Sequence, residues 1–404
     1  MFIKKINTRR ALILIKKIWY NSPFFNRDLW NYNTARYCYK VFKKKNKTKE
    51  PSIEKKVAVI IPHSSLLHHF FPITKHMRTS SYCFIIVNND SEEIKRIVAY
   101  LKYRKLNYKF PFDIFTNNIK YKVVLSNSSP IGISPIPPFD FTGEIFIKHV
   151  GELQVRMMYA GGKLRWNLGD WNKVYDYILC YGPYYTDLFK KKFKEIKTYE
   201  VGYPRFDSFF GEPINKIEAL KKLGLDPNKK TITYLPTHGK LSSFEKFKSL
   251  ILPLGKNYNV IIKPHPWLKI DPNILEKNDG VRLIDRNYNN ITCFQLADFV
   301  FADYGGSVLG SIYADKNLLL LDVEDPLKDH LNMSKDSPDL IVRKYIHHIK
   351  DRCPPHTITK LLSDDLLWKK QSGIRKKMRE KFFRFSKESG KIAASTLQNI
   401  LKTS

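Results

Sequence analysis

The chain has 404 residues, of which 43% are apolar and 14% aromatic. This composition supports two or three domains with large cores and excludes a disordered protein. Its 70 Lys and Arg against 38 Asp and Glu give a formal charge of +32, so we expect an anionic partner: nucleic acid, anionic lipid or an anionic substrate. The five cysteines, at positions 38, 83, 180, 293 and 353, have neither disulfide nor metal-ligand spacing, which favours a reducing compartment. No run reaches the roughly 18 apolar residues of a membrane-spanning helix.

Residues 1–50 are both basic and aromatic. They hold fourteen Lys or Arg and two acids, and between the charges stand aromatic side chains such as Trp19, Tyr20, Phe24 and Trp30. Lys and Arg can contact lipid phosphates while Trp, Tyr and Phe lie at the depth of the headgroups. The pattern predicts a segment that associates with an anionic membrane surface. The alternative is a solvated basic helix packed on its own domain.

Short apolar runs alternate with helical stretches from residue 51 to residue 207. We expect a helix over 91–102 and a Ser/Pro/Gly-rich connection over 127–138. The expected strands are 57–61, 83–88, 123–125, 144–149 and 177–183. Such alternation predicts βαβ units and a parallel sheet, and therefore a first Rossmann-like domain over 51–207.

A second alternation of the same kind follows the turn at 202–207. It begins with an expected helix over 214–223 and fills residues 208–353. Its expected strands are 231–235, 260–263, 281–284, 299–302 and 318–322. Residues 354–404 read as C-terminal helices, strongly basic over 375–384. The sequence thus predicts two facing Rossmann-like domains with ligands in the cleft between them.

Two of the expected strands in the second domain end in residues that suit a phosphate. The apolar run 297–302 leads into Asp303-Tyr304-Gly305-Gly306-Ser307 and then a helix, a turn that leaves free backbone N–H groups at the helix N-terminus. The strand before it ends in Lys263 and His265. Because carboxyl ends of parallel strands share one edge, we expect a nucleotide-diphosphate site there. A plain tight turn is the alternative.

These segments, taken together with others, resemble a known family. Four motifs stand in order along the chain: Gly202-Tyr203-Pro204-Arg205-Phe206-Asp207, Tyr234-Leu235-Pro236-Thr237, Lys263-Pro264-His265-Pro266 and Asp303-Tyr304-Gly305-Gly306-Ser307. Over roughly residues 145–400 this series is similar to the CDP-glycerol glycerophosphotransferases of teichoic-acid and capsule synthesis. The resemblance implies a GT-B-like fold. It also implies transfer of a polyol phosphate, most readily glycerol phosphate, from a CDP-activated donor to a hydroxyl of a lipid-linked or glycan acceptor.

The resemblance also implies roles for particular residues. The family's histidine–glycine pair is matched nearest by His149-Val150-Gly151, which makes His149 the expected base for the incoming hydroxyl. His265, held between two prolines, is expected to act on a donor phosphate. The expected donor-binding residues are Arg205, Thr237, His238, Lys263, Asp303, Gly305, Gly306 and Ser307. For Arg205 and Asp207 an ion pair that braces the hinge is the equal alternative.

Three departures from the family pattern keep other interpretations open. His238-Gly239 stands where the family has Trp-Arg, Gly305-Gly306 where it has a serine pair, and Glu152-Leu153-Gln154 after the histidine motif. A GT-B glycosyltransferase using a CMP- or UDP-linked sugar in capsule or lipopolysaccharide synthesis is therefore the alternative enzyme. A basic nucleic-acid-binding protein is the alternative of another class, although no helix-turn-helix, zinc or RNP signature supports it.

No cofactor is certain from the sequence. Asp322, Glu324 and Asp325 follow an expected buried strand and could hold a divalent cation, but this spacing is common in acidic loops. We expect a cytoplasmic enzyme, peripheral on the inner face of the cell membrane, whose partners are the CDP-activated donor, the acceptor and the anionic lipid surface, and not nucleic acid.

Overall fold

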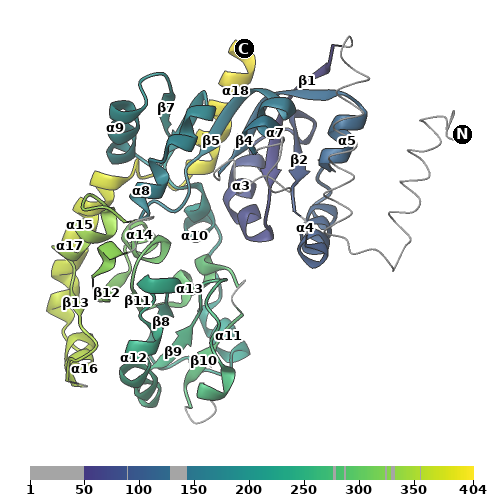
Figure 1. Ribbon diagram of the computed structural model, residues 1–404. Coiled ribbons are helices and arrows are strands. Elements are labelled where there is room, and N and C mark those ends of the chain that lie inside the picture. The colour runs from purple at the N-terminus through teal and green to yellow at the C-terminus, as the bar shows by residue number, and fades with distance from the viewer. Residues whose placement is uncertain are drawn as a thin grey trace, which may run out of the picture.

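The computed structural model describes residues 50–88, 90–127, 143–275, 279–285, 288–323, 325–328, 333–354 and 356–404. In these residues the chain forms two parallel sheets, each flanked by helices, one above the other in Figure 1. This confirms the predicted α/β architecture with two Rossmann-like halves. The predicted membrane segment lies outside the described residues except for Glu50, as does nearly all of the predicted connection over 127–138.

The first domain holds a sheet of seven strands in the order β3-β2-β1-β4-β5-β6-β7, all paired in parallel. Its strands are β1 (Ser52–Ile61), β2 (Tyr82–Ile86), β3 (Tyr108–Lys109), β4 (Ile119–Ser126), β5 (Gly151–Met157), β6 (Tyr177–Cys180) and β7 (Lys197–Glu200). Its helices are α3 (Leu67–Thr74), α4 (Ser91–Tyr103), α5 (Pro111–Thr116), α7 (Gly143–Val150), α8 (Leu164–Asn167) and α9 (Pro183–Lys192). The strand order reverses between β1 and β4, which makes their carboxyl ends the switch point of this sheet.

One predicted strand of this domain is wrong. Residues 144–149 belong to helix α7, and the strand follows it as β5. Ile147 and Val150, three residues apart, are both fully buried while Lys148 between them is exposed, as one face of a helix requires. The helix gives way to β5 at Gly151, which pairs with Tyr121 of β4; a Cβ at Gly151 would stand 2.3 Å from Val124 Cγ2.

The second domain holds a sheet of six parallel strands in the order β10-β9-β8-β11-β12-β13. Its strands are β8 (Thr231–Leu235), β9 (Asn259–Ile262), β10 (Val281–Leu283), β11 (Phe299–Ala302), β12 (Asn317–Leu321) and β13 (His348–Ile349). Its helices are α10 (Asp207–Gly211), α11 (Lys216–Lys222), α12 (Phe244–Ile251), α13 (Asn290–Leu296), α14 (Gly306–Tyr313), α15 (Pro338–Arg343) and α16 (His356–Leu362). The order reverses between β8 and β11, so the switch point lies at Pro236–His238 and Asp303–Gly306.

Two C-terminal helices connect the domains. Helix α17 (Asp365–Phe382) packs on α14 and β12 of the second domain and on α9 of the first. Helix α18 (Ser389–Thr403) then crosses back and packs against α3, β1 and β4, as Figure 1 shows. A carbon at the Cβ position of Gly390 would stand 2.1 Å from the carbonyl oxygen of Pro72, so only glycine permits this approach. The last residues of the chain therefore complete the first domain.

The hinge is fixed by Asp207 and by stacked aromatic rings. Asp207 accepts hydrogen bonds from the N–H groups of Ser389, at 2.9 Å, and Gly390, at 2.7 Å, and so caps α18. Tyr203 stacks on Phe383 with ring centroids 5.8 Å apart. The ion pair that was one alternative for Arg205 and Asp207 is not formed, because Asp207 bonds to backbone and Arg205 contacts His69.

Four cysteines lie in the described residues, and all four are free thiols: Cys83, Cys180 and Cys293 are buried and Cys353 is partly buried. Among the described helices, none is long and apolar enough to cross a membrane.

Candidate active site

The turn after β11 begins with an acid that binds protein backbone. Asp303 is fully buried and accepts the N–H groups of Thr237, at 2.9 Å, and Ser243, at 2.9 Å, together with the hydroxyl of Ser243. Burial raises the pKa of Asp303 to about 6, against the opposing effect of these hydrogen bonds. These contacts hold the loops after β8 and β11 together. Asp303 therefore positions the loops of the predicted donor site and does not itself face the ligand.

Gly305 and Gly306 present the open side of this turn. Gly305 has a φ of +89°, in the region that favours glycine, and its N–H donates to Asp339 Oδ1 at 2.9 Å. A Cβ at either glycine would meet no atom within 4 Å. Ser307, in the first turn of α14, points back and donates to the carbonyl of Leu235 at 3.3 Å. A phosphate could therefore approach the turn through the glycines, whereas Ser307 is directed into the fold.

Two histidines and a lysine meet beside this turn. His238 and His265, which follow β8 and β9, pack with ring centroids 4.2 Å apart. Lys163, from the loop after β5 of the first domain, reaches across the junction to within 3.3 Å of His238 Nε2. Burial and the nearby His238 and Lys163 lower the pKa of His265 to about 3, so this imidazole is neutral at pH 7. The exposed indole of Trp267 borders the pair, 4.8 Å from the His238 ring.

A second group of basic side chains spans the same junction. Arg205 Nη1 donates to His69 Nε2 at 3.2 Å, and the Arg205 Nε is buried with no hydrogen-bond partner among the described residues. Lys263 is 6% exposed. Burial and the charge of Arg205 lower the pKa of Lys263 to about 8, an effect that Cys293 and Asp285 partly offset. Burial, Arg205 and Lys263 likewise lower the pKa of His68, on α3, to about 4.

This second group is an unusual concentration of positive charge. In the part of the chain that the structure describes, neither Arg205 nor Lys263 forms a salt bridge. Arg205 disfavours the charge on Lys263, and both raise the cost of protonating His68. A phosphate between these side chains would relieve that repulsion.

His149 does not lie with these residues. It is in the last turn of α7, just before the amino end of β5, whereas the groups above stand at carboxyl ends of strands. Burial and the charge of Lys120, near the amino end of β4, lower its pKa. The structure thus brings together Arg205, Thr237, His238, Lys263, Asp303, Gly305 and His265, and places His149 at the opposite edge of the first sheet.

The acidic residues after β12 are engaged in ion pairs. Asp322 bonds to Arg343 Nε at 2.9 Å and to His348 Nδ1 at 2.5 Å, and Glu324 lies outside the described residues. Within the described ranges, no three His, Cys, Asp or Glu side chains are placed to hold a metal ion.

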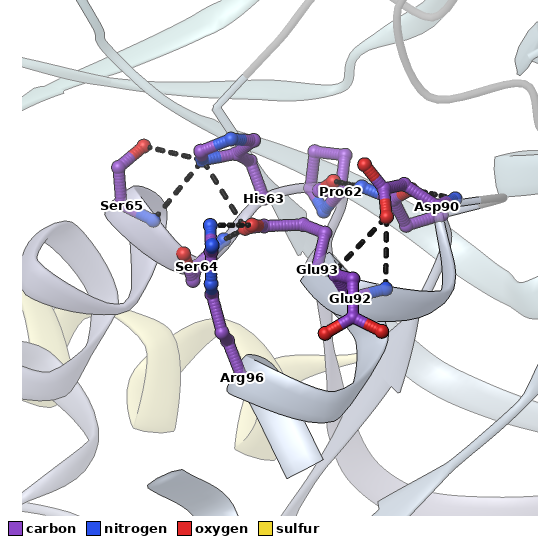
Figure 2. A network of polar contacts seen from close by, with 9 residues as sticks. Pro62, His63, Ser64, Ser65, Asp90, Glu92, Glu93 and Arg96 are labelled. Atoms are coloured by element: carbon purple, nitrogen blue, oxygen red, sulfur yellow. Dashed lines mark hydrogen bonds and ion pairs between the residues drawn. The ribbon is translucent and has the colours of Figure 1, made fainter. Parts of the chain in front are cut away.

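The carboxyl end of β1 carries a further polar network that the sequence analysis missed (Figure 2). His63 follows Pro62 and contacts Ser65 and Glu93, and Glu93 comes from helix α4. Missed with it were His68, His69 and Lys163. Of these four, only His63 carries the signal that identified Lys263 and His265, a basic residue or histidine just after a buried strand. His68 and His69 lie in α3, and Lys163 is in the loop after β5.

Comparisons with known proteins bear on the family of one part of the chain and on the fold of the whole. Residues 146–310 match the sequence profile of the family described as CDP-Glycerol:Poly(glycerophosphate) glycerophosphotransferase. The whole structure is similar to that of the wall teichoic acid polymerase TagF, at 15% sequence identity and a TM-score of 0.60, over 99% of this chain and 98% of that one. A histidine variant of the same polymerase soaked with CDPG gives 15% identity and a TM-score of 0.59, over 99% of both chains.

A more distant likeness is to UDP-GlcNAc 2-epimerase from Neisseria meningitidis bound to UDP-GlcNAc, at 10% identity and a TM-score of 0.51, over 86% of this chain and 100% of that one. No curated protein sequence matches the chain.

The two facing Rossmann-like sheets and their likeness to TagF define the class of fold, which is GT-B. The family resemblance predicted from the motifs is confirmed over residues 146–310, which match the family model of the CDP-glycerol glycerophosphotransferases.

Proposed function

We propose that the chain transfers a polyol phosphate, in the first instance glycerol phosphate, from a CDP-activated donor to a hydroxyl of a lipid-linked or glycan acceptor. In this reaction the acceptor oxygen attacks the phosphorus that carries the polyol, and CMP leaves. Phosphoryl transfer of this kind needs positive charge around the phosphates and a base for the hydroxyl proton.

The observation that carries the proposal is the buried Lys263 together with the half-buried Arg205, neither of which has a carboxylate partner among the described residues, beside the open glycine turn. Buried cations without a carboxylate partner are costly unless a ligand supplies the counter-charge. A diphosphate bound between Gly306 and Lys263 would meet the backbone N–H groups at the start of α14 on one side and cations on the other. The neutral His265 could donate a hydrogen bond to an oxygen of this diphosphate. His238 and Lys163, in contact across the junction, would lie beside the bound diphosphate.

A ligand screen tests the donor. Titration calorimetry of the full chain with CDP-glycerol, CDP-ribitol, CMP and UDP-linked sugars should give binding to the cytidine nucleotides and release of CMP only from a CDP-polyol. Tighter binding of a UDP-sugar than of CDP-glycerol would favour the glycosyltransferase alternative instead.

The base predicted at His149 stays a prediction, and its position at the amino end of β5 makes the test decisive. If His149 is the base, His149→Ala lowers turnover by about 10²–10⁴-fold and leaves donor affinity unchanged. If the base lies at the carboxyl edge, His149→Ala changes neither quantity by more than about twofold. CMP release at saturating CDP-glycerol distinguishes the two outcomes.

We further propose that residues 1–50 hold the enzyme on an anionic membrane surface, where a lipid-linked acceptor would be found. Each basic residue near such a surface contributes roughly 1 kcal/mol, an effect that falls off within a Debye length. Deleting residues 1–45 should release the chain from phosphatidylglycerol vesicles in a sedimentation assay and leave binding of CDP-glycerol intact. If the truncated chain sediments as fully as the intact one, the contact lies elsewhere, and the basic stretch 375–384 of α17 is the next segment to test.

A further inference from the structure

An exposed tryptophan stands beside the candidate donor site, and the core of the fold does not use it. Trp267 is 76% exposed, and among the described tryptophans it alone is exposed. Its neighbours Leu268 and Ile270 pack against the core of the second domain, whereas Trp267 does not. A single exposed apolar side chain needs no explanation by itself, so its position decides what it can do.

The indole of Trp267 borders two residues of the donor site. Its ring centroid lies 4.8 Å from that of His238 and 5.6 Å from that of His265. The interplanar angles are 77° and 68°, so neither imidazole stacks on the indole. Because most of the residue is exposed as well, the indole has a flat apolar surface that is open to a ligand.

The loop that carries Trp267 also fixes the tautomer of His265. The backbone N–H of Trp267 donates to His265 Nδ1 at 3.2 Å. Because Nδ1 accepts this bond, the neutral ring carries its proton on Nε2, where it can donate to a phosphate oxygen. Pro264 and Pro266 restrict the backbone on both sides of the histidine. The proposed phosphate contact and the indole therefore belong to one rigid loop.

The order of the strands gives the distance between the glycine turn and this loop. Strands β11, β8 and β9 are neighbours in the sheet, and after them come the glycine turn, His238 and the loop with Trp267. Adjacent strands are about 4.8 Å apart, so the loop after β9 starts about 10 Å from the glycine turn. A nucleoside diphosphate whose terminal phosphate lies at Gly306 is long enough to place its base on the indole.

The base is the part of a CDP-activated donor that an indole can hold best. Cytosine has a π-face, on which aromatic side chains stack, whereas the polyol has hydroxyl groups and the phosphates carry charge. Loss of one such stacking contact typically lowers affinity by about 5–150-fold. Stacking uses no particular pattern of hydrogen-bond donors and acceptors, so it strengthens binding of a pyrimidine without selecting cytosine over uracil.

We propose that Trp267 is the stacking platform for the cytosine base of the donor. This inference rests on the proposed function, because it takes the donor to be a CDP-activated polyol whose phosphates lie at Gly306 and His265. Trp267 binds the base and takes no part in the bonds that form and break.

The test uses Trp267→Ala in the full chain, since replacing an exposed side chain should leave the fold intact. We expect its affinity for CMP, measured by calorimetry, to fall about 5–150-fold, with CMP release at saturating CDP-glycerol unchanged. Trp267→Phe keeps an aromatic face and should retain most of the CMP affinity. Tyr103→Ala removes an aromatic side chain that is 81% exposed on α4, and as the matched control it should bind CMP like the wild type.

Tryptophan fluorescence gives a second measurement that is specific to the base. CMP should quench the emission of the wild type, and inorganic pyrophosphate at the same concentration should not. In Trp267→Phe the quenching by CMP should be lost while CMP still binds.

CMP affinity of Trp267→Ala within about twofold of the wild type would overturn the proposal. Quenching of Trp267→Phe as complete as that of the wild type would overturn it too, because the base would then lie elsewhere. Slower CMP release at saturating CDP-glycerol with unchanged CMP affinity would assign the indole to the acceptor instead. Failure of the wild-type chain to bind any cytidine nucleotide would refute the proposed function, and this inference with it.

Discussion

The two sheets turn their carboxyl edges toward the same junction but equip them differently. At the edge of the second domain, the carboxylate of Asp303 accepts hydrogen bonds from the backbone N–H groups of Thr237 and Ser243. The open glycines and the buried Lys263 are left to contact a ligand. At the edge of the first domain the acid is kept beside a histidine whose outer nitrogen is exposed. The first arrangement leaves its outer side open to a negatively charged ligand, whereas in the second the Glu93 carboxylate is itself held by the N–H of Ser64 and by Arg96. The proposed phosphate binding therefore belongs to the edge of the second domain, which Lys163 of the first domain reaches across the junction.

If the two edges differ in this way, blocking the glycine turn should have the largest effect on donor binding. Gly305→Val adds a branched side chain in open space and in a backbone conformation, with φ of +89° and ψ of −144°, that is almost confined to glycine and costs other residues on the order of 1–3 kcal/mol. We expect CDP-glycerol and CMP binding to fall below detection in calorimetry, with a native circular dichroism spectrum. Gly373→Val, equally open but in α17, is the matched control. Unchanged CMP affinity in Gly305→Val would remove the turn from the donor site.

Replacing Lys263 should have a smaller effect on donor binding. The substitution should raise stability while it lowers donor affinity. Lys263→Met removes a buried charge whose pKa, lowered from 10.5 to about 8, corresponds to a cost on the order of 3 kcal/mol. The free protein should therefore unfold at a higher temperature, while donor affinity falls roughly 10–100-fold because a charge-assisted contact is lost. The exposed Lys240→Met should change neither quantity. A variant that is less stable and binds normally would show that Lys263 has a structural role.

The smallest effect is a pH dependence from the same lysine. Because its pKa is about 8 rather than 10.5, Lys263 loses its proton as the pH rises through 8, and donor affinity should weaken by up to tenfold per pH unit above that value. His68 and His265, with pKa values of about 4 and 3, stay neutral throughout this range. Folding has the opposite trend: between pH 8 and 10.5 the unfolded chain holds the proton more tightly, so the Lys263 contribution to the unfolding free energy rises with pH.

Calorimetric titrations from pH 7 to 9.5 measure the effect on affinity, and Lys263→Arg, which stays charged, should abolish it. A pH profile of the arginine variant that matches the wild type would assign the titration to another group.

The sequence predicted the second domain more accurately than the first, and the reason is physical. Strands β8 and β11 have the predicted bounds because they are central in the sheet, buried on both faces, and therefore read as continuous apolar runs. The segment 144–149 was read as a strand because a six-residue apolar run does not distinguish a strand from a buried helix. The strand begins only at Gly151, where the chain pairs with β4. That pairing is a tertiary contact, which the local sequence does not show.

Only the part of the candidate site that follows directly from chain order was predicted. Lys263, His265 and Gly305 follow strands that end at one edge, so chain order alone places them together. Lys163 and His68 reach the group from another domain, and Glu93 reaches His63 from a helix thirty residues away. Nothing in the linear sequence states how the two sheets face each other.

The return of α18 to the first domain has a consequence for synthesis on the ribosome. The first sheet is complete by Glu200, yet the surface of α3 that α18 covers, and with it the support for His68 and His69, stays open until the final residues are made. At about 5–20 residues per second, the roughly 200 residues in between take about 10–40 s. During this interval an apolar face beside α3 must be protected from other nascent chains. A premature stop within the last fifteen residues would leave that face uncovered in the finished product.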